Sequence, residues 1–181
     1  YTSSVSLGGD QVTNDLAQAL KTSTNNAEEL KIRHGCVTSA FENEDNIEVP
    51  GVGDRPARLV RKKIIIQVMS DRYQEIFSFV KEKIQQSGFE DRIPAGIVLT
   101  GGSSKVEGIE DLAEEVFHAQ VRVGIPEHIY GGSEDIIKNP EYAACVGLLI
   151  YAKEKESTKF VQSDNDFQSS IKKLLKKIFY D

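Results

Sequence analysis

One stretch of the sequence, residues 96–108 (GIVLTGGSSKVEG), constrains the fold more than any other. It opens with the apolar run Ile97-Val98-Leu99, which is typical of a strand buried on both faces of a parallel sheet. Two glycines follow, and apolar residues then recur at three- and four-residue steps, which predicts a helix with one apolar face. A strand, a glycine turn and a helix in this order place the turn at the carboxyl edge of an α/β sheet, where ligands bind. The spacing matches neither G-x-x-x-x-G-K-[ST] nor G-x-G-x-x-G, so a turn that binds no ligand stays an open alternative.

The charge of the chain is unevenly distributed. The net charge is −6, yet residues 171–181 hold four lysines and one aspartate, so that this end carries +3 and residues 1–170 carry −9. An acidic body argues against nucleic acid as the main partner, because phosphate binding requires a basic surface. A basic end on an acidic body indicates a separate task for that end.

Residue types that carry catalysis or bind metals are few. His34, His118 and His128 have no serine, cysteine or carboxylate at a spacing typical of a catalytic triad. Cys36 and Cys145 are too few for a disulfide framework, and no Cys/His cluster has the spacing of a zinc site. We therefore predict neither a catalytic residue nor a metal site in this chain.

Glycines and apolar periodicity predict the helices. An amphipathic helix over residues 11–21 begins after Asp10, whose side chain is expected to cap it. A second helix, over residues 26–34, is expected to end at Gly35. Two further helices are expected over residues 71–87 and 139–153, and the latter is apolar on nearly every side, which predicts a place in the core.

Residues 36–69 alternate short extended runs with turns. They predict a small antiparallel sheet, to which the apolar run 64–66 (III) contributes a strand. Arg61, Lys62 and Lys63 come just before or at the start of this run and would give the sheet a basic edge, which also discourages edge-to-edge aggregation.

The end of the chain has a composition of its own. Residues 154–168 hold few apolar residues and are predicted to be a flexible linker. Residues 169–181 then combine an apolar face with a lysine-rich face, which is typical of a helix that lies in a membrane interface. The apolar residues are Ile171, Leu174, Leu175, Ile178 and Phe179, and the lysines are Lys172, Lys173, Lys176 and Lys177. A helix docked on the body of the protein, or bound in a partner's groove, is the alternative.

Four stretches together resemble a known superfamily. Residues 99–104 (LTGGSS) with Gly108 look like the adenosine motif of the ATPases that include actin, sugar kinases and heat-shock chaperones. Residues 8–13 (GGDQVT), 27–31 (AEELK) and 139–147 strengthen this resemblance. Within the superfamily the chain most resembles the FtsA family of bacterial cell-division proteins, through residues 31–36 (KIRHGC), residues 116–124 (VFHAQVRVG) and the basic amphipathic end.

The resemblance implies an α/β architecture, the second lobe of an actin-like ATPase fold. Residues 1–10 and 72–153 would form its core subdomain, a sheet with flanking helices, and residues 11–71 a smaller inserted α+β subdomain. Residues 154–168 would link this lobe to a membrane-targeting amphipathic helix over 169–181.

The resemblance also implies an adenosine site. In the superfamily a glutamate and a lysine spaced like Glu28 and Lys31 reach the ribose and adenine. Judged from spacing alone, the same two residues share a helix face and would equally suit a solvated surface pair. The remaining nucleotide-binding candidates implied by the resemblance are Gly101, Gly102, Ser103 and Glu141.

Only half of an ATP site is expected in this chain. The two phosphate-binding hairpins of the superfamily, and the carboxylates that direct magnesium, have no counterpart in the sequence. ATP and magnesium would therefore be bound by the complete protein. The chain alone is expected neither to hydrolyse ATP nor to hold it tightly.

Partners follow from the same resemblance. Arg72, and less strongly Lys62 and Lys63, would contact the C-terminal peptide of the tubulin-like protein FtsZ. A soluble basic face without a partner is the alternative. The protein would also assemble with itself into filaments and bind the anionic inner face of the cytoplasmic membrane at the division site. A kinase or chaperone-like ATPase of the same superfamily is the other functional class that the sequence leaves open.

Overall fold

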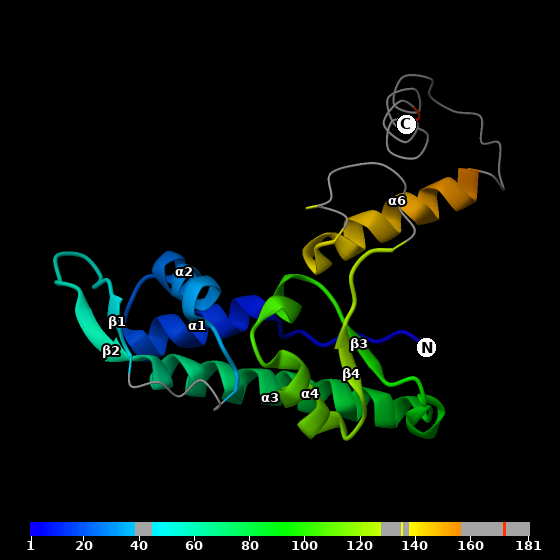
Figure 1. Cartoon of the computed structure of the whole chain (residues 1–181), viewed down its shortest axis with the longest axis horizontal. Coiled ribbons are helices and arrows are strands. Elements are labelled where there is room, and N and C mark those ends of the chain that lie inside the picture. The colour runs from blue at the N-terminus through cyan, green and yellow to red at the C-terminus, as the bar shows by residue number, and fades with distance from the viewer. Residues whose placement is uncertain (39–44, 128–134, 136–137, 157–171, 173–181) are drawn as a thin grey trace. The chain divides into compact units, whose positions relative to one another are not determined.

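The computed structural model describes residues 1–38, 45–127, 135, 138–156 and 172. His128 and, apart from Lys172, the predicted membrane helix lie outside these residues, as does the predicted linker beyond residue 156. The chain divides into two compact units. The first comprises Tyr1–Leu99 and Lys105–Arg122, and the second comprises Thr100–Ser104 and Val123–Asp181 (Figure 1). The subdomain boundaries expected from the sequence stay a prediction.

The first unit begins with two packed helices, α1 (Gly9–Leu20) and α2 (Thr24–His34). The residue that caps α1 is Gly8, with no side-chain hydrogen bond, so the prediction of an Asp10 cap is wrong. Asp10 lies instead within the first turn, where its charge is favourable toward the helix dipole. At the start of α2 the Ser23 hydroxyl accepts the Asn26 backbone N–H at 3.2 Å, and the helix ends at Gly35 as predicted.

A hairpin and a long helix follow. Strands β1 (Asn46–Val49) and β2 (Arg58–Arg61) pair antiparallel, and α3 (Lys62–Ser87) starts directly after them. The run 64–66 is therefore helical, and the prediction of a strand there is wrong.

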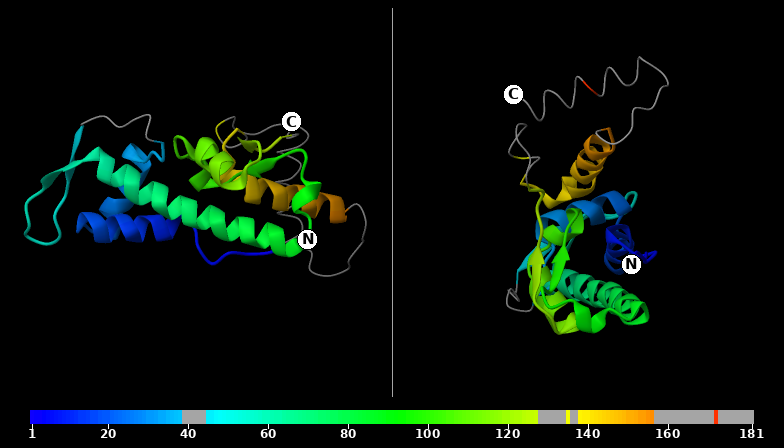
Figure 2. Two further views of the ribbon diagram at one scale, coloured as in Figure 1. Left: turned by 90° about the horizontal axis from the view of Figure 1, so that it is seen from below. Right: turned by 90° about the vertical axis from the view of Figure 1, so that its right-hand side faces the viewer.

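Burial explains why α3 begins so early. Ile65, Met69, Tyr73 and Phe77 are buried at four-residue steps, which form one continuous stripe along a helix. This stripe lies on a helix that packs against α1, as Figure 2 shows, and tertiary packing outweighs the strand preference of consecutive isoleucines.

The C-terminal half of α3 packs on α4 (Ile109–Phe117). The rings of Phe77 and Phe117 join the two helices at a centroid distance of 5.5 Å. The Lys81 ammonium donates to the Val116 carbonyl oxygen at 2.8 Å and so partners a carbonyl in the last turn of α4.

The strand–turn–helix unit of residues 96–108 is present with changes. Strand β3 (Ile97–Leu99) pairs with β4 (Val121–Val123), and a 3-10 turn, η3 (Gly102–Lys105), separates β3 from α4. Val98 is 50% exposed, so β3 is not buried on both faces as predicted. Among the residues that the structure describes, the sheet that holds β3 and β4 has two strands. Burial of both faces of a strand requires helices or other elements packed on each side of the sheet.

In the second unit, the 3-10 turn η4 (Pro140–Tyr142) leads into α6 (Ala143–Glu156). The Asn139 side chain caps the turn by accepting the Glu141 N–H at 3.1 Å. Leu148 is 69% exposed and Tyr151 54%, so this apolar helix is not the core helix that was predicted. Among the described residues, no helix has the length and apolar character needed to span a membrane.

Candidate functional site

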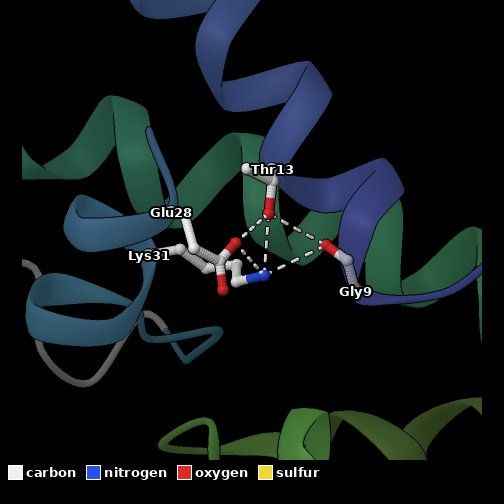
Figure 3. A network of polar contacts seen from close by, with 4 residues as sticks. All are labelled: Gly9, Thr13, Glu28 and Lys31. Carbon is white, nitrogen blue, oxygen red and sulfur yellow. Dashed lines mark hydrogen bonds and ion pairs between the residues drawn. The ribbon is translucent and has the colours of Figure 1, made fainter. Parts of the chain in front are cut away.

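A polar network joins α1 to α2 and contains two of the predicted nucleotide-binding residues (Figure 3). The Lys31 ammonium donates to the Gly9 carbonyl oxygen at 3.1 Å and to the Thr13 hydroxyl at 2.7 Å. It also forms an ion pair with Glu28 Oε2 at 2.6 Å. The Lys31 side chain is 11% exposed and that of Glu28 43%, so Lys31 is largely buried while Glu28 still reaches solvent. This burial distinguishes the pair from an ordinary solvated pair on a helix surface.

Thr13 belongs to this network, and sequence reasoning missed it. Its side chain is almost fully buried, and its hydroxyl oxygen lies within hydrogen-bond distance of Glu28 Oε2 and 3.1 Å from the Gly9 carbonyl oxygen. A threonine inside a helix can donate a hydrogen bond to the carbonyl oxygen four residues earlier, so the contact between Thr13 and Gly9 could have been predicted from the sequence. The bond to Glu28 joins residues 15 positions apart and needs the packing of α1 on α2.

Glu28 is ionised at neutral pH. Partial burial on its own would raise the pKa of this carboxyl group, but hydrogen bonds from Lys31 and Thr13 and the positive charge of Lys31 outweigh it. The net effect lowers the pKa of Glu28 below its ordinary value. The network therefore holds a carboxylate that can accept further hydrogen bonds from solvent or from a ligand.

The glycine turn lies in the second unit. Gly101 has a φ of +96°, which favours glycine, and its N–H donates to the Pro140 carbonyl oxygen at 3.0 Å. At Gly102 an added Cβ would meet only the Glu141 Cγ, at 3.9 Å. The structure thus brings Gly101, Gly102 and Glu141 together, with Ser103 exposed in the same turn.

The predicted nucleotide residues are divided between the two units. Glu28 and Lys31 belong to the first, and the glycine turn with Glu141 belongs to the second. The first unit holds an ionised acceptor, Glu28, and the second holds an open glycine turn, and the nucleotide-binding role of these residues stays a prediction.

Arg72, the predicted peptide contact, lies on α3 beside a groove of about 370 Å³. Its guanidinium pairs with Asp15 of α1 and with Glu75 one turn further along α3. The hydrogen bond to Asp15 is the main reason that the pKa of Arg72 is raised, and partial burial opposes it. The lining residues are Asp15, Gln18, Ala19, Val68, Asp71, Arg72 and Glu75.

Lys62 and Lys63 are not part of this groove. They start α3, and Lys63 precedes Arg72 by about 2.5 helical turns, which puts it on the opposite side of the helix. Burial lowers the pKa of His34, and the positive charges of Lys62 and Arg33 lower it further.

Comparison with known proteins identifies the family. A family model described as "Cell division protein FtsA" matches residues 1–147. FtsA of Pseudomonas aeruginosa is 48% identical over 158 residues, which cover 87% of this chain and 38% of that protein. FtsA of Escherichia coli K12 is 36% identical over 186 residues, covering 98% of this chain and 44% of that protein. The chain spans less than half the length of these relatives.

Solved structures agree on the fold. MreB5 of Spiroplasma citri bound to ADP has a TM-score of 0.65 over 85% of this chain and 46% of its own, at 14% identity. The same protein bound to AMPPNP has a TM-score of 0.64. The fold is actin-like, and the family predicted from the sequence is confirmed: the chain belongs to the FtsA family of cell-division proteins.

Proposed function

We propose that this chain acts in cell division as part of an ATP-binding protein that holds FtsZ filaments at the membrane. The observation that carries the nucleotide part of the proposal is the Lys31–Glu28–Thr13 network, because it keeps an ionised carboxylate at a partly exposed position. The glycine turn at Gly101 and Gly102 supports it, since the backbone there is open to a flat ligand. Membership of the FtsA family favours this role over that of a kinase or chaperone-like ATPase.

The residues present fit the adenosine part of ATP. Glu28 would accept a hydrogen bond from the nucleoside, and the turn at residues 101–103 and Glu141 stay proposed nucleotide contacts of the second unit. MreB5, the structural neighbour, is bound to ADP in one structure and to AMPPNP in another. Within the described part of the chain, no cluster of three or more His, Cys, Asp or Glu could hold a metal ion, and we assign no magnesium ligand to it.

Glu28→Gln should weaken ATP binding by about tenfold, because the proposed hydrogen bond would lose its charged acceptor. The measurement is calorimetric titration of ATP into the full-length product of the gene that carries this chain. Glu29→Gln is the matched control, since Glu29 also pairs with a cation, Arg33, but at 3.5 Å and on the exposed side of α2. Equal losses in the two variants, or no binding by the unaltered protein, would count against the nucleotide site.

Arg72 is the proposed contact for the acidic FtsZ C-terminal peptide, through charge-assisted hydrogen bonds. Its guanidinium already pairs with Asp15 and Glu75, so a peptide carboxylate would compete with them. Lys62 and Lys63 stay predicted contacts at the start of the same helix.

Asp15→Asn should therefore strengthen binding of the FtsZ peptide by about threefold to tenfold, since it removes both a competitor and a repulsive charge. Fluorescence anisotropy of a labelled peptide measures this. Asp71→Asn is the control, because Asp71 lines the same groove but bonds to Gln67, at 2.8 Å, and not to Arg72. If Asp15→Asn weakens the peptide complex, or if both variants act alike, competition at Arg72 is not the mechanism.

Residues 169–181 are proposed to attach the protein to the membrane, on the sequence pattern alone. Four lysines near an anionic leaflet contribute about 1 kcal/mol each. One tail would bind weakly and reversibly, whereas a self-assembled filament that presents many tails gains on the order of 10²–10⁴ in avidity. The proposed location of the protein is therefore the cytoplasmic face of the inner membrane at the division site.

Removal of residues 168–181 should abolish binding of the chain to anionic vesicles, and neutral vesicles should bind neither form. Replacement of the four tail lysines by glutamine should lower the affinity for anionic vesicles by more than about a hundredfold. Vesicle sedimentation provides both measurements. If the chain still binds vesicles without the tail, the tail is not the membrane anchor, and the alternative of a partner-binding helix is favoured.

A further inference from the structure

An apolar groove of about 590 Å³ lies in the first unit, where the first residues of the chain meet the C-terminal end of α3. It shares no lining residue with the groove beside Arg72 and none with the network around Lys31. Its volume is within the range of small-molecule pockets, about 300–1,000 Å³. The apolar lining residues are Val5, Val80, Ile84, Phe89 and Ile93.

The buried stripe of α3 opens into this groove. Tyr73 is 3% exposed and Phe77 7%, whereas Val80 and Ile84, which continue the same helical face, are half-buried. Phe89, just beyond the end of the helix, is 44% exposed. The described chain therefore leaves apolar surface accessible at this end of α3, and a ligand that covered this surface would gain free energy from its burial.

The rim of the groove is positively charged. Lys83 and Arg92 line it, and none of its described lining residues is Asp or Glu. The Lys83 ammonium donates to a neutral acceptor, Gln86 Oε1, at 3.2 Å, and the Arg92 guanidinium lies 5.9 Å from the centre of the Phe89 ring. Within the described part of the chain neither cation forms an ion pair with a carboxylate, so both can pair with an anionic group of a ligand.

A hydrocarbon chain that ends in an anion fits this arrangement better than a peptide does. The α3 wall of the groove presents side chains, because backbone groups inside a helix bond to one another. This wall therefore offers few partners for a peptide backbone, whose unpaired groups are costly to bury. A hydrocarbon chain has no polar groups to satisfy, and its single anionic end would lie at the rim.

We propose that this groove binds a free long-chain fatty acid, with the carboxylate at Lys83 and Arg92 and the hydrocarbon chain against Val80, Ile84 and Phe89. The site is independent of the proposed nucleotide, peptide and membrane contacts. The net charge of the chain is −6, so the protein as a whole repels an anion. A preference for an anionic ligand over a cationic one of the same length therefore requires a local positive site.

Calorimetric titration of dodecanoate, octanoate and dodecylammonium into the 181-residue chain, each below its micelle concentration, tests the proposal. Each methylene that the groove buries contributes a factor of about four to the affinity, so dodecanoate should bind at least about tenfold more tightly than octanoate. Dodecanoate should also bind at least about tenfold more tightly than dodecylammonium. No binding of dodecanoate, or a preference for the cation, would overturn the proposal.

Variants locate the site. Lys83→Gln combined with Arg92→Gln should weaken dodecanoate binding by about tenfold or more, because the carboxylate loses both cations. Lys21→Gln is the matched control, since Lys21 is an exposed lysine of the same unit outside the groove, and it should leave the affinity unchanged. Val80→Phe should weaken dodecanoate binding by a similar factor, because the larger side chain fills the groove. Equal affinities in all these variants would show that the fatty acid binds elsewhere.

Two further comparisons exclude other sites and other occupants. Removal of the basic residues 168–181 should leave dodecanoate binding unchanged, and loss of binding would assign the ligand to the tail. The full-length gene product should bind dodecanoate as the chain does. If it does not, another part of the polypeptide covers the groove and the proposal is wrong. A chain that is dimeric, and that Val80→Phe makes monomeric, would equally contradict it, because a second copy would then fill the groove.

Discussion

Gly35→Ala should lower the free energy of unfolding of the chain by about 3 kcal/mol, at the upper end of what overpacking costs. An added Cβ would lie 2.1 Å from the Lys31 carbonyl oxygen and 2.7 Å from the Met69 Cε. Met69 is fully buried but flexible, whereas the carbonyl belongs to the last turn of α2 and accepts the Gly35 N–H at 2.9 Å. Relief of the contact must therefore distort the end of the helix that carries Lys31.

Urea denaturation of the 181-residue chain measures this loss. Gly8→Ala is the control in the same unit, because an added Cβ there meets nothing within 4 Å. Gly8→Ala should cost at most about 1 kcal/mol, the value of glycine at a helix N-cap. Equal losses in both variants would mean that the close approach at Gly35 is relieved without strain.

Lys31→Met should destabilise the chain by about 2 kcal/mol at pH 7, because hydrogen bonds that involve a charged group contribute about 1.5–3 kcal/mol and the Glu28 side is partly screened by solvent. Methionine is one heavy atom shorter than lysine, but its unbranched apolar side chain lets the buried stem remain packed. The Gly9 carbonyl oxygen and the Thr13 hydroxyl would lose a donor, and Glu28 would lose its ion pair.

The loss should depend on pH in a defined direction. The pKa of Glu28 is lower in the folded chain than in the unfolded chain, so the folded state binds fewer protons near that pKa. The stabilisation is complete above the unfolded value of about 4.3 and disappears as the pH falls through the lowered folded value. The difference between Lys31→Met and the unaltered chain should therefore shrink below about pH 4.

Unfolding curves at pH 7 and at acidic pH provide this comparison, with Arg33→Met as the control. Arg33 pairs with Glu29 at 3.5 Å, with side chains 70% and 65% exposed, so its replacement should cost less than about 0.5 kcal/mol. An effect of Lys31→Met that is the same at both pH values would show that the ion pair with Glu28 contributes nothing to it.

Local signals predicted the features that local physics decides. The end of α2 at Gly35 was predicted because C-capping depends on the residue at the helix end, whereas α2 starts at Thr24, two residues before its predicted start, with Ser23 as the cap. Helical spacing predicted that Glu28 and Lys31 share a helix face, and the resemblance singled them out as site candidates. The glycine turn was predicted from its place after an apolar strand. The FtsA family followed from longer stretches of sequence and is confirmed.

Features set by tertiary contacts were not predictable in this way. The run 64–66 is helical because Ile65 belongs to the buried stripe of α3, which sequence periodicity over the isoleucines alone does not reveal. Val98 is half exposed because burial depends on which strands cover it. Thr13 joins the candidate site only through the packing of α1 on α2, and Lys31 is buried for the same reason.

The hydrogen bonds and the ion pair around Lys31 also limit which substitutions this chain can tolerate during evolution. A replacement that removes the hydroxyl at position 13, the carboxylate at position 28 or the ammonium group at position 31 leaves a partner unsatisfied at one of the other two, so such a single replacement is expected to carry a fitness cost that a paired replacement avoids. The residues at these three positions are therefore expected to covary. Among natural variants, viable replacements at one of them should be accompanied by a compensating replacement at another.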